Sequence, residues 1–154
     1  MEKNTLTFEE LLISIMEMAP TLINNSPIYK LASFAAKETI NHLPFTKTEP
    51  VAVSMGVLGD LTFPYTKMGA IDSLDLFGLD ELILFSYYWV NRHRYKKVLD
   101  LGANLGLHSI FLAKCGYDVT AYEPDPHHKD ILAKNLQLNG IENVTIKKKA
   151  ISDK

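Results

Sequence analysis

Hydrophobic and polar positions in the second half of the chain alternate between the spacing of strands and that of helices. Residues 98–101 form a short, mainly apolar run that ends at Gly102, as expected for a parallel strand buried on both faces. Helical spacing then begins, with Leu107, Ile110, Phe111 and Lys114 at positions i, i+3, i+4 and i+7. Gly116 follows where a left-handed helix cap is favoured. The pattern predicts a strand, a tight glycine turn and a helix.

The same alternation continues towards the end of the chain. Residues 118–123 alternate and are rich in β-favouring types, which predicts a second strand. Asp125 and Pro126 are the N-cap and first residue of a second expected helix, and Asn139–Gly140 ends it. Its inward face contains Ile131, Leu132 and Leu136. A third strand is expected to open at 143–146 and to run on towards 150–152.

The first half of the chain predicts helices and one hairpin. Thr7 and Glu10 match a capping box, so a helix should run from there to about Ala19. A second helix is expected from Pro27 to around His42, with an apolar face of Ile28, Leu31, Ala35 and Ile40. Two short β-like runs within 51–63 surround glycines and suggest a hairpin. A further helix, capped by Asp80, should run from Glu81 to about Arg92 and carry Leu82, Phe85, Tyr88 and Trp89.

Composition limits the function classes. With 154 residues, 47% of them hydrophobic, the chain can bury a core, and one domain is the default expectation. A net charge of -2 gives no strong attraction to nucleic acid or to an anionic membrane, so neither is expected as a partner. The lone Cys115 forms no internal disulfide and is expected to be a small packing residue. Without a signal peptide or a long apolar segment, we expect a soluble cytoplasmic protein.

The glycine turn and the acid that follows the second strand form the main chemical signal. Glu123 comes 21 residues after Gly102, where an acid accepts hydrogen bonds from the ribose hydroxyls of an adenosine held over the turn. A nicotinamide-dependent oxidoreductase would use such an acid too. Its G-x-G-x-x-G pattern requires glycine in place of Asn104 and Leu107, and Leu107 would obstruct close packing around a pyrophosphate.

Four motifs, in order, resemble the FkbM-type S-adenosylmethionine-dependent methyltransferases. They are Leu99–Gly106, Tyr122–Pro126, Asn135–Gly140 and Ala150–Asp153. The resemblance covers roughly residues 80 to 154. It implies an α/β fold in which the first three strands of a Rossmann-like class I methyltransferase sheet follow α-helices and a β-hairpin. The expected segments are 1–50 (helices), 51–79 (hairpin and loop) and 80–154 (partial cofactor-binding domain).

The resemblance also implies a cofactor site for S-adenosylmethionine. Gly102, Asn104 and Gly106 would border the methionine part of the cofactor. Glu123 would hold the ribose, and Asp100 would lie under the turn near the cofactor amino group.

Three further residues are assigned to the cofactor by the resemblance. Ala150 and Ile151 would lie beside the adenine. Glu81 is a candidate near the methionine end, because family members often carry an acid at the start of this helix. The alternative is a first-turn acid that favours the helix dipole.

The implied reaction is methyl transfer to a hydroxyl of a small molecule or glycan. No catalytic residue can be assigned. His108, in the first turn after the glycine loop, is either a general base or an ordinary helix-surface residue. Asp72 and Asp75 either contact a cofactor or metal or form a solvated turn. No metal site is expected at His127–His128, because adjacent helical side chains point about 100° apart.

The third expected strand is the last in this chain, whereas a complete class I sheet continues beyond it. We therefore expect half of a cofactor site, without measurable transferase activity on its own. The strand at 98–101 should present an unpaired edge, which either self-associates or is covered by the hairpin at 51–63. A non-catalytic cofactor-binding or partner module is the alternative function.

Overall fold

The computed structural model describes residues 7–22, 24–45 and 49–151 of the chain. The chain divides into two compact units, with the boundary between Tyr87 and Tyr88. This boundary falls inside helix α3 (Leu79–Val90), whereas the segments expected from the sequence divide before residue 80. The fold class is mixed α/β, as predicted.

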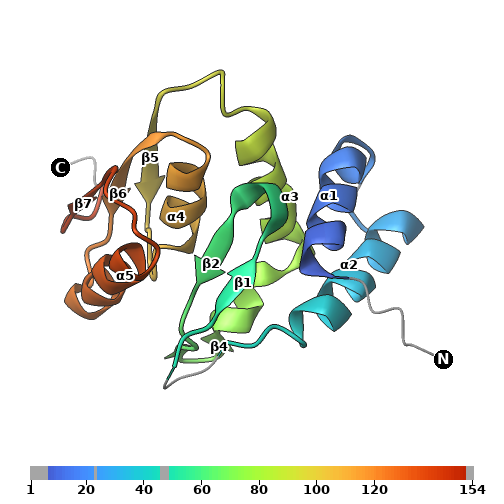
Figure 1. Ribbon diagram of the computed structural model, residues 1–154, viewed down its shortest axis with the longest axis horizontal. Helices are drawn as coiled ribbons and strands as arrows, with labels where there is room; N and C mark the ends of the chain where they lie inside the picture. The colour runs from blue at the N-terminus through green and yellow to red at the C-terminus, as the bar shows by residue number, and fades with distance from the viewer. Residues whose placement is uncertain (1–6, 23, 46–48, 152–154) are drawn as a thin grey trace. The chain divides into compact units, whose positions relative to one another are not determined.

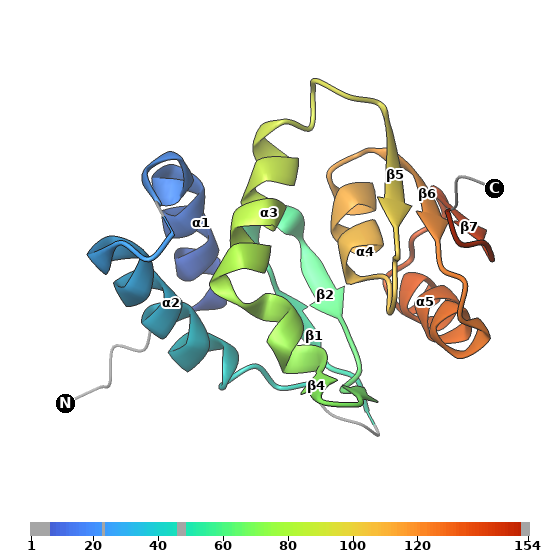
Figure 2. The same cartoon turned by 180° about the vertical axis from the view of Figure 1, so that it is seen from behind.

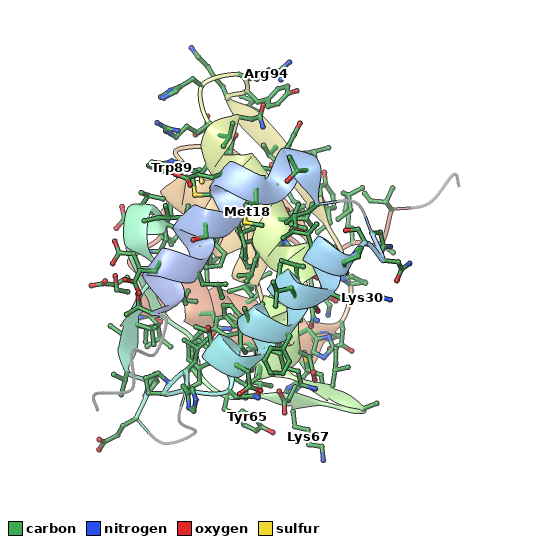
Figure 3. All side chains as sticks on the ribbon, turned by 90° about the vertical axis from the view of Figure 1, so that its right-hand side faces the viewer. Met18, Lys30, Tyr65, Lys67, Trp89 and Arg94 are labelled. Carbon is green, nitrogen blue, oxygen red and sulfur yellow. The ribbon has the colours of Figure 1, made fainter. Side chains whose placement is uncertain are left out.

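The first unit opens with the helices α1 (Phe8–Met18) and α2 (Pro27–Ile40), joined in part by a 3-10 turn, η1 (Ala19–Thr21). The predicted capping box is present: the Thr7 hydroxyl accepts from the Glu10 N–H, and the Glu10 carboxylate accepts from the Thr7 N–H. Figure 3 shows the two helices side by side, with the labelled Met18 at the end of α1 and Lys30 on α2.

The predicted helix α2 is present, but not all of the apolar residues that predicted it are buried. Ile40 is buried, but Leu31 is 64% exposed, and the residues buried beside Ile40 are Ala36 and Thr39. The buried residues Ala36, Thr39 and Ile40 lie three and four positions apart and so share one face, which Ile40 belongs to and Leu31 does not. Apolar spacing alone predicts a face, but the neighbour against which the helix packs selects which face is covered.

Two short antiparallel ribbons follow. The predicted hairpin is present as β1 (Ala52–Ser54) and β2 (Asp60–Thr62), joined through a 3-10 turn, η2 (Gly56–Leu58). A second ribbon, β3 (Lys67–Met68) and β4 (Ile71–Asp72), was not predicted.

Asp72 and Asp75 begin a 3-10 helix, η3 (Ser73–Phe77), and act as its capping box. The Asp72 carboxylate accepts from the Leu74 N–H, and the Asp75 carboxylate accepts from the Asp72 N–H. Both acids therefore have structural partners at the start of this helix. Phe77, the last residue of this helix, makes two edge-to-face ring contacts, with Phe63 and with Phe85.

Helix α3 begins at Leu79, so Asp80 lies in its first turn and is not the predicted N-cap. Asp80 instead accepts a hydrogen bond from the Tyr29 hydroxyl of α2. The helix ends at Val90, two residues before the predicted Arg92. Leu82 is fully buried, which fits the predicted core role of its apolar stripe.

The second unit contains a parallel sheet of β5 (Lys97–Leu101), β6 (Asp118–Tyr122) and β7 (Val144–Lys147). Its strand order is β5-β6-β7, as Figure 2 shows. Helices α4 (Leu107–Lys114) and α5 (Pro126–Leu138) connect the strands (Figure 1). Strand order follows chain order, so right-handed crossovers place both helices on the same face.

Two predictions about these strands need correction. Strand β7 ends at Lys147 and does not run on towards 150–152, the last of which lies outside the described residues. Strand β5 is not buried on both faces, because Leu99 and Leu101 are 62% and 55% exposed. They share the face opposite the one that α4 and α5 cover, and so their apolar side chains meet solvent within this unit.

Both helices of this unit end as their glycines predict. Gly116 and Gly140 have φ angles of 89° and 62°. Past α4 the N–H of Gly116 donates to Ala113 and that of Tyr117 to Leu112, the paired bonds of a Schellman cap. The equivalent donors past α5 are Gly140 and Ile141.

Strand β5 lies at one edge of the sheet, as predicted, and pairs with β6. Strands β1 and β2 pair with each other in a separate two-stranded sheet. The alternative in which the hairpin covers the β5 edge stays a prediction. In the described part of the chain, no helix is long and apolar enough to span a membrane.

Candidate functional site

The turn between β5 and α4 has a left-handed backbone at three of its residues. The φ angles of Gly102, Asn104 and Gly106 are 78°, 49° and 85°. The N–H groups of Gly102 and Ala103 both donate to the carbonyl of Tyr122, at 2.9 and 3.0 Å. The start of the turn is therefore fixed to the carboxyl end of β6, where open α/β sheets bind ligands.

Glu123 joins the turn to the next helix. Its carboxylate accepts from the Asn104 N–H through Oε2 and from the Asp125 N–H through Oε1, both at 2.8 Å. The residue is only 5% exposed. Each carboxylate oxygen has capacity for a further donor. Asn104 and Glu123, two of the predicted cofactor residues, are thus in direct contact, and both carboxylate oxygens lie at the tip of β6.

The two predicted turn glycines have different surroundings. A Cβ atom on Gly102 would meet nothing within 4 Å, whereas one on Gly106 would lie 2.9 Å from the Leu132 Cγ of α5. Gly102 is exposed and Gly106 is buried. Gly102 therefore borders open space at the turn, and Gly106 permits close packing of the turn against α5.

Asp100 lies in β5 on the helix-covered face, below the turn. Its Oδ2 accepts a hydrogen bond from the Ser109 hydroxyl of α4 at 2.6 Å, and Ser109 is fully buried. This bond joins the strand before the turn to the helix after it. The predicted contact of Asp100 with a cofactor amino group stays a prediction.

Sequence reasoning gave no role to Asn135 of α5. Its amide Nδ2 donates to the Leu105 carbonyl at 2.8 Å, and the residue is 1% exposed. The signal was available, because a polar residue stands between the inward-facing Leu132 and Leu136. A polar side chain on a buried helix face needs a hydrogen-bonding partner, which here is the turn itself.

Three further predicted cofactor residues lie on other segments of the chain. Ala150 and Ile151 follow β7 and are exposed. Glu81 lies in the first turn of α3, within the first unit, and is half-buried. Their cofactor roles stay predictions.

His108 has an aromatic partner. Its Nδ1 lies 3.0 Å from the Tyr88 hydroxyl, and the Tyr117 hydroxyl donates to the Tyr88 carbonyl at 2.9 Å. The histidine is half-buried, so it is more constrained than an ordinary helix-surface residue. A contact of His108 with a substrate stays a prediction.

Two groups of the second unit have shifted pKa values. The N–H groups of His128 and His127 donate to Asp125 and hold the pKa of its carboxyl below the usual value. Burial raises the pKa of the Cys115 thiol to about 11, as suits a packing residue. Among the described residues, no group of three His, Cys, Asp or Glu side chains could hold a metal ion.

The family model described as "Tellurite resistance protein TehB" matches residues 90–153, most of the second unit. No curated protein matches the sequence. A SAM-dependent methyltransferase from Agrobacterium tumefaciens is similar in structure, with a TM-score of 0.52 and 19% identity over 66% of this chain and 33% of that one. The fold is Rossmann-like.

A second similar structure is coclaurine N-methyltransferase bound to N-methylheliamine and SAH. It has a TM-score of 0.38 and 17% identity, over 94% of this chain and 42% of that one. The chain thus spans about a third of the length of the Agrobacterium structure. The matching family model is TehB, which differs from the FkbM subtype that the motifs resemble.

Proposed function

We propose that this chain forms the nucleoside-binding part of an S-adenosylmethionine-dependent methyltransferase. The observation that carries the proposal is the buried Glu123 carboxylate, which bonds the glycine turn at the tip of β6. The proposal is further supported by the match of residues 90–153 to the TehB family, whose members are methyltransferases of this class.

The turn favours this cofactor over a dinucleotide. A pyrophosphate is held by backbone N–H groups that point at the ligand. Here the N–H groups of Gly102, Ala103 and Asn104 are directed to acceptors of the protein itself. A ligand with a nucleoside and an amino acid, but no phosphate, suits a turn whose donors are already satisfied.

Each of the residues in and around the turn that follow has a proposed role. Glu123 accepts hydrogen bonds from the ribose hydroxyls, and the open space above Gly102 admits the methionine part. Asp100 accepts from the amino group, and Asn104 and Gly106 keep the turn in its left-handed conformation. The cofactor supplies an electrophilic methyl group on its sulfonium, and the protein positions the acceptor in line with it.

Ala150 and Ile151 are proposed to lie beside the adenine. A role for Glu81 near the methionine end is proposed from the sequence resemblance alone. The acceptor is a hydroxyl of a small molecule or glycan, and the subtype is FkbM. The four sequence motifs support these finer assignments. The whole protein's transferase activity belongs to the proposal too, because the chain spans a third of the similar methyltransferase.

Self-association through β5 is also proposed. The strand lies at the sheet edge, and its Leu99 and Leu101 side chains are exposed. Unpaired edges beside apolar side chains promote pairing with another chain. Light scattering at several protein concentrations tests this, and a monomer at all of them contradicts it.

Calorimetric titration with S-adenosylhomocysteine tests the proposed function. Hydrogen bonds to a charged group contribute about 1.5–3 kcal/mol, so Glu123→Ala should weaken binding roughly tenfold to a hundredfold. Glu142→Ala, at an exposed acid of the same unit, is the matched control and should leave affinity unchanged. Urea unfolding of each variant verifies that it is folded during the titration.

Three outcomes separate the alternatives. Equal affinity of the wild type and Glu123→Ala would remove Glu123 from the site. Tighter binding of NADH than of S-adenosylhomocysteine would favour an oxidoreductase. Binding without any turnover of S-adenosylmethionine would favour the non-catalytic module.

A further inference from the structure

The glycine turn is hydrogen-bonded to the end of β6 and to helix α5 before any ligand binds. The Tyr122 carbonyl accepts from its first two N–H groups, and the Glu123 carboxylate accepts from Asn104. The third contact is of opposite polarity, because the Asn135 amide donates to the carbonyl of Leu105. The β6 end therefore fixes the donors of the turn, and α5 fixes an acceptor.

Packing alone does not explain an asparagine at this position. Leu132, one turn earlier on α5, already fills the space beside Gly106. A buried amide costs free energy unless its hydrogen bonds are made, whereas an apolar side chain would fill the same site without this cost. What the amide adds is direction, because it bonds the Leu105 carbonyl in one orientation of the peptide plane.

That peptide plane matters for the site. Leu105 stands between Asn104, whose N–H bonds Glu123, and Gly106, which precedes α4. Rotation of the Leu105 carbonyl away from α5 would change ψ of Leu105 and φ of Gly106, and so would move the turn relative to Glu123. A turn that is already in place spares a ligand the cost of ordering it.

We propose that Asn135 is a positioning residue for the cofactor site: it holds the turn in the ligand-binding conformation through the Leu105 carbonyl. This rests on the proposed function. It also gives a role to the Asn135–Gly140 motif, in which Asn139 supports the same helix by donating to the Asn135 carbonyl at 2.8 Å.

The chain contains a matched control. The Asn143 amide donates to the Tyr117 carbonyl at 2.8 Å and to the Ala113 carbonyl at 3.4 Å, at the opposite end of α4 from the turn. Like the Asn135 bond, these bonds join an asparagine side chain to a backbone carbonyl on another segment of the same unit. Asn135→Leu and Asn143→Leu therefore each remove side-chain-to-backbone bonding at one end of α4, from a buried residue in the first case and an exposed one in the second.

The experiment compares the wild type with both variants of the full chain. Amide hydrogen exchange of Asn104 and Gly106 reports the turn without ligand, and titration with S-adenosylhomocysteine reports the site. Asn135→Leu should lower the protection of both amides and the affinity about tenfold each. Asn143→Leu should lower global stability alone and leave both readouts within about twofold of the wild type.

The outcomes distinguish this inference from the proposed function. Wild-type binding that Asn135→Leu leaves unchanged, or that Asn143→Leu weakens equally, overturns the positioning role alone. A wild-type chain that does not bind S-adenosylhomocysteine refutes the proposed function, and the cofactor role of Asn135 with it. If Asn135→Leu does not fold, Asn135→Ala removes the same donor without adding bulk and is judged by the same criteria.

Discussion

The two units of the chain use their polar side chains differently. In the described part of the first unit, the side-chain hydrogen bonds that cap helices are made within a few residues of the donor. The Thr7 hydroxyl accepts from Glu10, the Ser26 hydroxyl from Tyr29, and the Asp72 carboxylate from Leu74. These bonds cap the first turns of helices. They depend on the local sequence and not on what each helix packs against.

In the second unit the important bonds join separate elements. Glu123 bonds Asn104 from the end of β6, and Asn135 bonds Leu105 from α5. Ser109 of α4 bonds back to β5. All three meet around one turn. Local bonds fix where an element begins, whereas bonds between elements fix a geometry in space, and only the second kind should affect a ligand site.

The two turn glycines should separate packing from conformation, with the largest expected effect. Gly106→Ala adds a Cβ that overlaps Leu132 and also forces a left-handed alanine, so the free energy of unfolding should fall by about 2–4 kcal/mol. Gly102→Ala has only the second cost, about 1–2 kcal/mol. Urea denaturation measures both.

Equal losses of stability would mean that α5 shifts to accommodate the Cβ added at position 106. The ligand readout should rank the two variants in the opposite way. Per unit of lost stability, Gly102→Ala should weaken S-adenosylhomocysteine binding more, because its Cβ enters the open space at the turn.

The single thiol of the chain reports on the second unit alone. Cys115 is buried at the end of α4, and burial raises its pKa to about 11, so both accessibility and thiolate content are low. Iodoacetamide at pH 8 should modify it at least about a hundredfold more slowly in the native protein than in urea. Fast native modification would show that this end of α4 opens readily.

A cap of the first unit should affect stability without affecting binding. Thr7→Ala removes the side-chain half of a capping box and should cost about 1 kcal/mol in the free energy of unfolding. The affinity for S-adenosylhomocysteine should not change once the protein is folded. A weakened affinity would show that α1 and the cofactor site are coupled, and the contrast between the units would fail.

The smallest expected effect concerns helix-capping carboxylates, which both units contain. Hydrogen bonds from the N–H groups of His128 and His127 hold the pKa of Asp125 below its usual 3.8, and a bond from the Leu74 N–H lowers that of Asp72. An acid whose pKa is depressed in the folded state stabilises above its unfolded pKa, and this contribution is lost as pH falls through the folded value.

The free energy of unfolding of the wild type should therefore fall relative to Asp125→Ala and to Asp72→Ala as the pH is lowered from about 5 to 3. Urea unfolding at several pH values measures this. A constant difference across that range would contradict the role of the charged cap in both units.

Element ends could be predicted because their signals are local. Thr7, Asp125 and Gly140 are each recognisable within a few residues of the chain. The packed face of α2 could not be predicted, because its apolar residues allow more than one stripe and only the neighbouring helix selects among them. The polar Asn135 on an inward helix face could be recognised from the sequence, but its partner could not, since Leu105 lies 30 positions away.

The predicted ends of the strands were limited in a similar way. Sequence pattern placed the beginning of β7, but its end depends on how far β6 extends beside it. The last paired residues are Tyr122 and Lys147, and the ladder ends there. A free continuation to Ile151 would have had no strand to pair with on that side.

The order of strands in the parallel sheet has a consequence for folding. Each strand pairs with the next strand along the chain, so every pairing closes a loop of one helix and its two connections. Loop closure of this length costs less entropy than pairing of more distant segments, because the cost grows with the logarithm of the loop length. The second unit can therefore assemble in sequence from β5 to β7, one crossover after another, as the chain emerges during synthesis.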